Sequence, residues 1–307
     1  MNTTFRNYFR TLYTKTNGFI PMQPLAGNAH PGDFFQIRNG EIVFLGNIFN
    51  PQIIDQFEVD FEFGMLLNPT SWSISEGVSK PYSGRGTGHN PIDGEFEFSK
   101  QILAFKDKGS FVFKGENPEA VRIVNWDGIK DELIVKMTQT YYSFREVYVI
   151  TECAVMNNWT LAISGAPEGE LEIATESENF GLIDLFGHSS SKTIQSKDID
   201  YYHRESNQKS SFFKAKKLIV NDGKVEHFVS NLLTRRSAHQ KWAKSFFPYE
   251  FYHLDGMYSD LATGTVNASV LDMLQGNQLN PNTALDYFSW TNTSLDDVEK
   301  LFLTYGG

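Results

Sequence analysis

The feature that most constrains this chain is a strict alternation of apolar and acidic side chains over residues 57–63. Phe57, Val59, Phe61 and Phe63 alternate with Glu58, Asp60 and Glu62. Because successive side chains of a strand point to opposite faces, the segment is predicted to be a strand with one apolar and one acidic face. The chain also holds 26 Phe, 13 Tyr and 5 Trp, residues that favour packed sheet faces. We therefore predict a β-rich fold.

Other segments extend this prediction. Hairpins are expected for residues 33–38 with 41–45, 94–105 with 110–114, and 146–155 with 159–164, and further strands over 170–175 and 212–220. The glycine-rich residues 83–88 are expected to form a flexible loop without a core of its own. Helical spacing of apolar side chains predicts a short basic amphipathic helix over residues 5–12 and a second helix over 128–140.

From Val225 onward the pattern becomes helical, with apolar residues at positions 225, 228, 229, 232 and 233. Shorter helical patterns follow at 268–275, 281–289 and 295–305, and Ser294 and Asp297 have the spacing of a capping box. The predicted fold class is therefore α+β: a twisted antiparallel sheet with peripheral helices, followed by a small all-helical C-terminal segment. We place the boundary between residues 1–223 and 224–307.

Composition excludes several functions. The net charge is −10 and the pI about 5.2, so a fold-wide basic surface for nucleic acid is absent. The one cysteine, Cys153, allows no internal disulfide and is expected to be a buried thiol in a strand. No window approaches the about 18 apolar residues of a spanning helix. With no leader-type apolar stretch at the N-terminus, we expect a cytoplasmic protein.

No constellation of catalytic or ligand-binding residues emerges from the sequence. Gly84, Gly86 and Gly88 resemble a phosphate loop but lack the preceding strand, the following helix and the Lys-Ser/Thr pair. The seven histidines show no HExxH or HxH spacing. His188 precedes three serines without the G-x-S-x-G turn of a hydrolase. We therefore expect no enzyme activity, no cofactor and no metal.

Basic residues gather in a few places against the acidic background. They are Arg6 and Arg10 in the first helix, then Lys214, Lys216 and Lys217, then Arg235 and Arg236 followed by Lys241 and Lys244. Each group is either a solvated face or a contact with anionic lipid, which stabilises binding by about 1 kcal/mol per basic residue. Arg235-Arg236 also suits a trypsin-like protease if it is accessible.

Three segments resemble bacterial gasdermins. Residues 131–163 (DELIVKMTQTYYSFREVYVITECAVMNNWTLAI) resemble the helix, central strand and hairpin of that family. Residues 189–224 resemble its closing section, with an F-x-A-x-x-L strand at Phe213, Ala215 and Leu218 and a turn at Gly223. Residues 32–49 resemble its opening hairpin, which ends here in Leu45-Gly46. The likeness spans residues 5–224.

The resemblance implies a latent pore former that an activating protease releases from an inhibitory C-terminal segment. Arg235 and Arg236 are the candidate protease site, and Arg6, Arg10, Lys214, Lys216 and Lys217 are the candidate lipid contacts. The protein then self-associates into a large oligomer and moves from the cytoplasm to the inner membrane, killing the cell in an antiphage-type defence.

Spanning strands need about 9–11 residues with one lipid-facing side. Phe57, Val59, Phe61 and Phe63 are the candidate membrane strand, and residues 95–105, 169–175 and 191–201 are further candidates. This chain departs from the family in lacking a cysteine near the N-terminus, where bacterial members often carry a lipid-modified one. Its C-terminal segment is also longer than the usual inhibitory tail.

A second interpretation stays open. Half-buried antiparallel sheets show the same alternation without any membrane, so the chain could equally be a non-enzymatic cytosolic or phage-type β-structural binding protein. The acidity of the C-terminal segment favours the first interpretation. From Ser237 to Gly307 three lysines stand against eight acids, a net charge of 3 − 8 = −5, and an acidic segment can cover basic residues.

Overall fold

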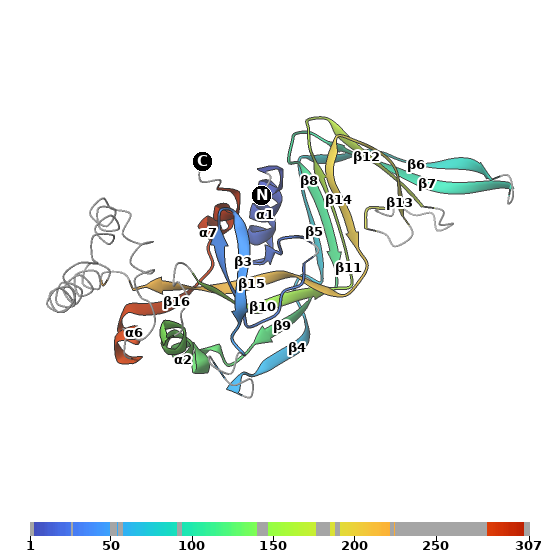
Figure 1. The fold of residues 1–307 in the computed structure, drawn as a ribbon. Helices are drawn as coiled ribbons and strands as arrows, with labels where there is room; N and C mark the ends of the chain where they lie inside the picture. The colour runs from blue at the N-terminus through green and yellow to red at the C-terminus, as the bar shows by residue number, and fades with distance from the viewer. Residues whose placement is uncertain are drawn as a thin grey trace, which may run out of the picture.

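The computed structural model describes residues 3–25, 27–49, 54, 58–90, 94–139, 147–175, 185–187, 191–221, 224 and 281–303. Its main feature is a set of four long bent strands that cross three successive sheets (Figure 1). The first is β4 (Phe61–Leu66), β5 (Ser71–Glu76) and β6 (Val78–Asn90); the second is β7 (Gly94–Phe105), β8 (Phe111–Glu116) and β9 (Glu119–Ile123). The third is β10 (Tyr148–Met156), β11 (Asn158–Ser164) and β12 (Gly169–Thr175); the fourth is β13 (Lys192–Lys197), β14 (Ile199–Glu205) and β15 (Lys209–Val220).

The four strands keep the same neighbours along their whole length. Sheet A contains β15, β10, β9 and β4, sheet B has the order β14-β11-β8-β5, and sheet C has the order β13-β12-β7-β6. All these pairs are antiparallel. Sheet A also takes in β1 (Ile20–Pro21), β2 (Asp33–Arg38), β3 (Glu41–Asn47) and β16 (Phe288–Asn292). Sheet C extends away from the rest of the molecule as an arm (Figure 1).

The helices lie around sheets A and B. They are η1 (Thr3–Phe5), α1 (Arg6–Lys15), α2 (Trp126–Gln139), α6 (Pro281–Tyr287), α7 (Leu295–Glu299) and η3 (Lys300–Phe302). Tyr8, Phe9 and Leu12 form the buried face of α1, which completes the main aromatic core with Phe113 and Trp159. A second core lies under α2 and α6, and a smaller third one lies where sheet B meets sheet C.

The predicted α+β class is confirmed, as are the helices near residues 5–12 and 128–140 and the hairpin of β2 and β3. The buried thiol is confirmed as well: Cys153 Sγ donates to the Ala29 carbonyl at 3.4 Å, and burial raises its pKa.

Two predicted hairpins are wrong. β7 pairs with β6 and β12, whereas β8 pairs with β5 and β11. Likewise β10 and β11 do not pair with each other but continue from sheet A into sheet B. Short turn-forming segments such as Asn157-Asn158 mark bends between sheets here, where strands change layer without reversing. The expected flexible loop at residues 83–88 is also wrong, because these residues form part of β6 and pair with β7 throughout.

The C-terminal segment differs from the prediction in one respect. The helix expected over 281–289 ends at Tyr287, and residues 288–292 form β16, which pairs with β15. The alternating Phe288 and Trp290 suit a strand edge, and pairing with β15 satisfies backbone groups that a helix would otherwise satisfy internally. The helix expected near 295–305 is present as α7 and η3, with its capping box.

Candidate functional site: the contact of residues 288–303 with the sheet

Residues 288–303, which we call the C-terminal latch, comprise β16, α7 and η3. β16 adds to the edge of β15 in antiparallel register from Lys216 opposite Asn292 to Val220 opposite Phe288. Trp290 donates its indole Nε1–H to the Lys130 carbonyl at 3.0 Å and meets Trp126 edge-on at 5.4 Å between ring centroids. The latch is thereby joined to both sheet A and α2.

Asp297 is the polar centre of the latch. The residue is 4% exposed, and its carboxylate accepts from Lys217 Nζ at 2.9 Å and from the Tyr148 hydroxyl at 2.8 Å. It also accepts from the Ser294 backbone N–H at 2.9 Å in the capping box and from Lys300 Nζ at 3.2 Å. Burial by itself raises the pKa of Asp297, but the hydrogen bonds from Lys217, Ser294 and Tyr148 outweigh it and hold that pKa well below its ordinary value. Asp297 is therefore a charged carboxylate at neutral pH.

A second carboxylate joins the latch to the first helix. Glu299 accepts from Arg6 Nε at 2.6 Å and from Arg10 Nε at 2.9 Å. The two arginines are about half exposed, with 50% and 46% of their side-chain surface open, so each pair contributes about 1 kcal/mol or less. Tyr13 adds a hydrogen bond from its hydroxyl to the Thr293 carbonyl at 2.7 Å.

Apolar packing also joins the latch to the rest of the protein. Val298, Leu301 and Phe302 are buried in the main aromatic core, and Phe302 meets Phe9 of α1 edge-on at 5.4 Å. The turn between β2 and β3 fits closely against the latch: a Cβ on Gly40, whose φ is +78°, would lie 3.0 Å from the Leu301 carbonyl oxygen. Removing the latch would therefore expose part of the core as well as its polar groups.

The structure places four of the five candidate lipid contacts against this latch. Arg6 and Arg10 bind Glu299, and Lys217 binds Asp297. Lys216 donates from Nζ to Asn292 Oδ1 at 2.9 Å. The remaining one, Lys214, pairs with Glu152 at 3.2 Å and lies over the Phe19 ring. Arg235 and Arg236, the candidate protease site, lie outside the described residues.

The candidate membrane strand is shorter than its sequence pattern. Phe57 lies outside the described residues, and β4 begins only at Phe61. Val59 precedes the strand and is 6% exposed, Phe61 is half-buried, and Phe63 is 70% exposed. The apolar positions of residues 57–63 therefore do not share one covered face in this structure.

Sequence reasoning found some of the site and missed the rest. It identified Asp297 through its capping box, but not its bonds to Tyr148 and Lys217, which are 149 and 80 residues away in the chain. In the sequence, Glu299 contributes only to the negative charge of the C-terminal segment. One sequence feature could have indicated Glu299: it lies about one turn after the helix cap at Ser294, and the chain contains a basic helix, α1, that could face it.

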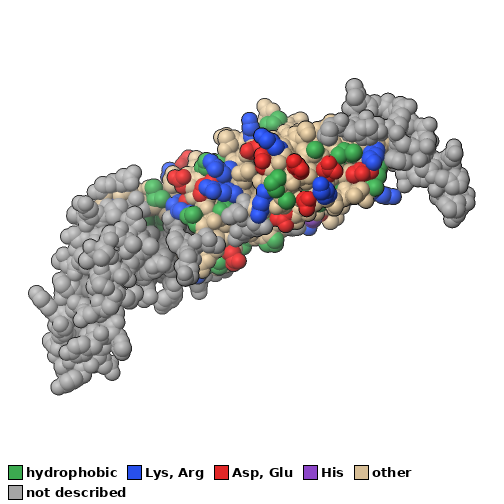
Figure 2. Space-filling model, turned by 90° about the horizontal axis from the view of Figure 1, so that it is seen from above, with side chains coloured by type: hydrophobic (Ala, Val, Ile, Leu, Met, Phe, Trp, Pro, Cys, Tyr) green, Lys and Arg blue, Asp and Glu red, His purple; other side chains and the backbone are tan. Residues whose placement is uncertain are grey.

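Charges on the face seen in Figure 2 are mixed, with lysine and arginine interspersed among aspartate and glutamate. In the described part of the chain no helix is both long and apolar enough to span a membrane. Across those same residues, no three His, Cys, Asp or Glu side chains gather as metal ligands would.

The arm contains two long paired strands. β6 has 13 residues and β7 has 12, and they pair from Val78 opposite Phe105 to Asn90 opposite Gly94. β12 joins β7 and β13 joins β12, so the arm combines two strand pairs from distant parts of the sequence.

No family model matches this chain, and no curated protein sequence matches it. Among solved structures it is similar to a bacterial gasdermin from Bradyrhizobium tropiciagri, at 11% identity and a TM-score of 0.25, over 64% of this chain and 80% of that one. It is also similar to the gasdermin A3 membrane pore, at 12% identity and a TM-score of 0.24, over 71% of this chain and 90% of that one. At these scores the likeness places the chain in no family, and the resemblance noted in the sequence stays a prediction.

Proposed function

We infer that this chain is a latent pore-forming protein whose C-terminal segment keeps it inactive. Proteolysis near Arg235 and Arg236 frees the segment, copies associate on an anionic membrane, and strands of the arm cross it. Its partners are then the protease, membrane lipids and further copies of itself. The latent form belongs in the cytoplasm and the active form in the inner membrane, where leakage kills the cell in an antiphage-type defence.

One observation carries this proposal: the latch holds Arg6, Arg10, Lys216 and Lys217. The sequence predicts these same residues as lipid contacts. Basic side chains near an anionic surface stabilise binding by about 1 kcal/mol each. While Asp297, Glu299 and Asn292 hold them, that contribution is reduced, and removal of the latch restores it.

The arm supplies the second support. A tilted spanning strand needs about 9–11 residues, and β6 and β7 exceed that length with 13 and 12. The arm carries only the small third core, so little packing opposes its rearrangement. Backbone groups in hydrocarbon must all be bonded, and the arm already pairs its four strands with one another.

The test compares leakage of dye from anionic liposomes for the intact chain and for the chain cut after Arg236. Cleavage uses a recognition sequence for a site-specific protease inserted at that point, so that trypsin does not cut elsewhere. We expect leakage only after cleavage. A chain carrying a scrambled recognition sequence is the matched control. Equal leakage from cut and uncut chains contradicts the inhibitory role of the segment, and no leakage from either favours the β-structural binding protein.

A further inference from the structure

The two borders of sheet A have a directional relation that bears on assembly. β4 is antiparallel to β9, β9 to β10, β10 to β15, and β15 to β16. Four reversals separate β4 from β16, so these two strands run in the same direction at opposite borders of the sheet (Figure 1). A second copy in the same orientation can therefore bring its β4 to the β15 border antiparallel to β15, as β16 lies now.

The two strands also share a side-chain pattern. β16 begins Phe288-Ser289-Trp290, and β4 begins Phe61-Glu62-Phe63. In both, two aromatic residues are separated by one polar residue, so both aromatics fall on the same face of the strand. In β16 these residues oppose Val220 and Leu218 of β15. The aromatic pair of an incoming β4 fits the same two positions.

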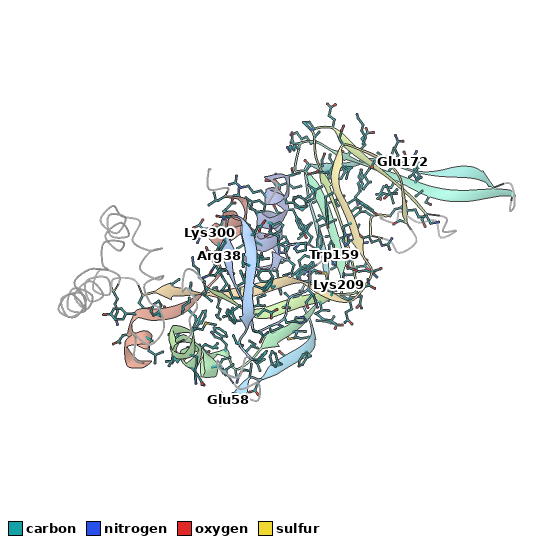
Figure 3. The ribbon with its side chains drawn as sticks, viewed as in Figure 1. Arg38, Glu58, Trp159, Glu172, Lys209 and Lys300 are labelled. Atoms are coloured by element: carbon teal, nitrogen blue, oxygen red, sulfur yellow. The ribbon has the colours of Figure 1, made fainter. Side chains whose placement is uncertain are left out.

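The charged residues of the two borders lie at different positions along the paired strands. β15 carries Lys216 and Lys217, which the latch holds through Asn292 and Asp297. Around β4 lie the exposed Glu58 and Asp60, and Figure 3 places Glu58 on the β4 side of sheet A and Lys300 at the latch. When the latch leaves, the lysines lose these two partners. With Phe61 opposite Val220, Glu58 and Asp60 lie beyond Val220, away from Lys216 and Lys217, so the fit rests on strand direction and the aromatic pair.

β4 is also exposed as a border strand. Among the described residues it pairs with β9 alone. Phe63 is 70% exposed and Leu66 56% exposed, and the neighbouring Val124 is 50% exposed. Unpaired backbone groups beside exposed apolar side chains form a template for another strand. On the same border of β15, β1 pairs only with Phe212 and Phe213. The five residues that now pair with β16, Lys216 to Val220, can therefore pair with another strand of similar length.

We propose that β16 occupies, within one copy, the place that β4 of a second copy takes after activation. The proposal rests on the proposed function and names the assembly surface. The border of β15 from Lys216 to Val220 receives residues 61–66 of the next copy. The contact is head-to-tail, because each copy keeps a free β4 on one side and a free β15 on the other. Such contacts repeat around a ring or along a filament.

A disulfide between copies tests the surface directly. If Phe61 and Phe63 take the places of Phe288 and Trp290, and β4 keeps its bulge at Gly64, Leu66 lies opposite Lys216 as Asn292 does now. Facing Cα atoms in an antiparallel pair lie about 4.5–5.5 Å apart, within the range for a disulfide. Chains carrying Leu66→Cys are mixed with chains carrying Lys216→Cys, both with Cys153→Ser and the protease site. After cleavage, on anionic vesicles and in solution, we expect a crosslinked dimer under oxidation.

The matched control is Ile194→Cys, which places a thiol at another exposed apolar position on a border strand. Ile194→Cys mixed with Lys216→Cys should give no dimer. Equal dimer yields from Leu66→Cys and Ile194→Cys, or no dimer from Leu66→Cys, would overturn the proposal. The crosslink is read separately from leakage. A dimer without leakage therefore supports the assembly surface and contradicts the pore-forming function. Leakage without a dimer supports the pore-forming function and contradicts the assembly surface.

Two further variants test the exchange of strands. Lys216→Cys with Asn292→Cys, which face each other in one chain, should lock β16 in place. The cleaved but oxidised protein then stays monomeric, and reduction restores assembly; assembly of the fully oxidised protein would contradict the exchange. Phe63→Lys should leave the thermal midpoint unchanged, because Phe63 is exposed, and slow leakage by at least about tenfold, the factor for 1.4 kcal/mol. Unchanged leakage in Phe63→Lys would also count against the exchange.

Discussion

Sheets A and B with their helices form a base, and sheet C forms an arm; the two differ in what holds them together. The base packs aromatic side chains from α1, β8, β10, β11, β15 and the latch into one continuous core. The arm shares only the small third core with sheet B, and every side chain of β13 is exposed. Hydrophobic burial is the main favourable term in folding, so the base carries most of the stability, and the arm depends on strand pairing.

This difference indicates how one chain can be both stable and able to rearrange. Regions with few buried apolar contacts open at lower free energy than the whole molecule. The arm can therefore change its surroundings while the base stays folded. The latch belongs to the base through Val298, Leu301 and Phe302, so its release acts on the stable part.

The largest expected effect comes from matched truncations in the two regions. Ile150 in the base and Ile173 in the arm are both essentially buried, at 0% and 1% exposure. Ile→Ala costs about 2–5 kcal/mol, depending on how far the surroundings relax. We expect Ile150→Ala to approach the upper end and Ile173→Ala the lower end, measured by urea unfolding. Equal losses would break the comparison, because the arm would then be packed as firmly as the base.

A slightly smaller effect is expected at the latch. Asp297→Ala removes a buried carboxylate and leaves Lys217 and the Tyr148 hydroxyl without it. Breaking a fully buried pair costs about 3–5 kcal/mol. Because Lys217 and Lys300 keep 16% and 25% of their side-chain surface open, we expect about 2–3 kcal/mol. Asp296→Ala, one residue earlier and exposed, is the control and should change little.

The leakage assay sharpens this prediction. If Asp297 holds the latch closed, uncleaved Asp297→Ala protein should leak dye where uncleaved wild type does not. Loss of stability without any leakage would show that Asp297 supports the fold but not the latent state.

The next effect depends on pH. Asp297 has its pKa lowered from the ordinary 3.8, so its contribution is full above pH 3.8 and is lost as pH falls through the lowered pKa. The latch should therefore stay closed at mildly acidic pH. The difference in unfolding free energy between wild type and Asp297→Asn should be constant from pH 7 to about pH 4 and then shrink. Glu205, whose pKa is lowered to about 2, titrates in both proteins, so its contribution cancels in the difference between their unfolding free energies. A difference that shrinks already near pH 6 would contradict this role.

Local pattern predicted the elements more successfully than their partners. The spacing of Ile129, Leu133 and Met137 identified α2, and Ser294 with Asp297 identified the start of α7, because helices and caps depend on residues three or four apart. The pairing of β10 with β15 depends on residues about sixty positions apart, which no local pattern encodes. The expected hairpin of residues 146–155 with 159–164 is therefore a strand that bends without reversing.

The candidate site shows the same division. The basic residues of β15 could be selected by composition, since they stand out against an acidic chain. Their contacts could not be predicted in this way, because Asp297 and Asn292 reach these lysines only when the C-terminal segment folds back onto the sheet. Residues 83–88 show the converse: their glycines favour a loop locally, whereas pairing with β7 along the whole arm makes them a strand.

The smallest expected effect on stability, and the sharpest contrast with the base, concerns Ile194 in β13. Its side chain is 53% exposed among exposed neighbours, so Ile194→Lys should leave the unfolding free energy within about 0.5 kcal/mol of wild type. In a membrane the outcome changes, because a lysine on the lipid face near the midplane costs about 2–4 kcal/mol per strand. Cleaved Ile194→Lys should therefore bind anionic vesicles normally and leak slowly. Gln195→Lys adds the same charge at the adjacent exposed position and should leak like wild type. Normal leakage from both variants would remove β13 from the membrane-crossing strands, and slow leakage from both would point to an effect of charge alone. A defect confined to Ile194→Lys would separate the two regions, because a change in the arm that leaves folding unaffected would then slow the leakage.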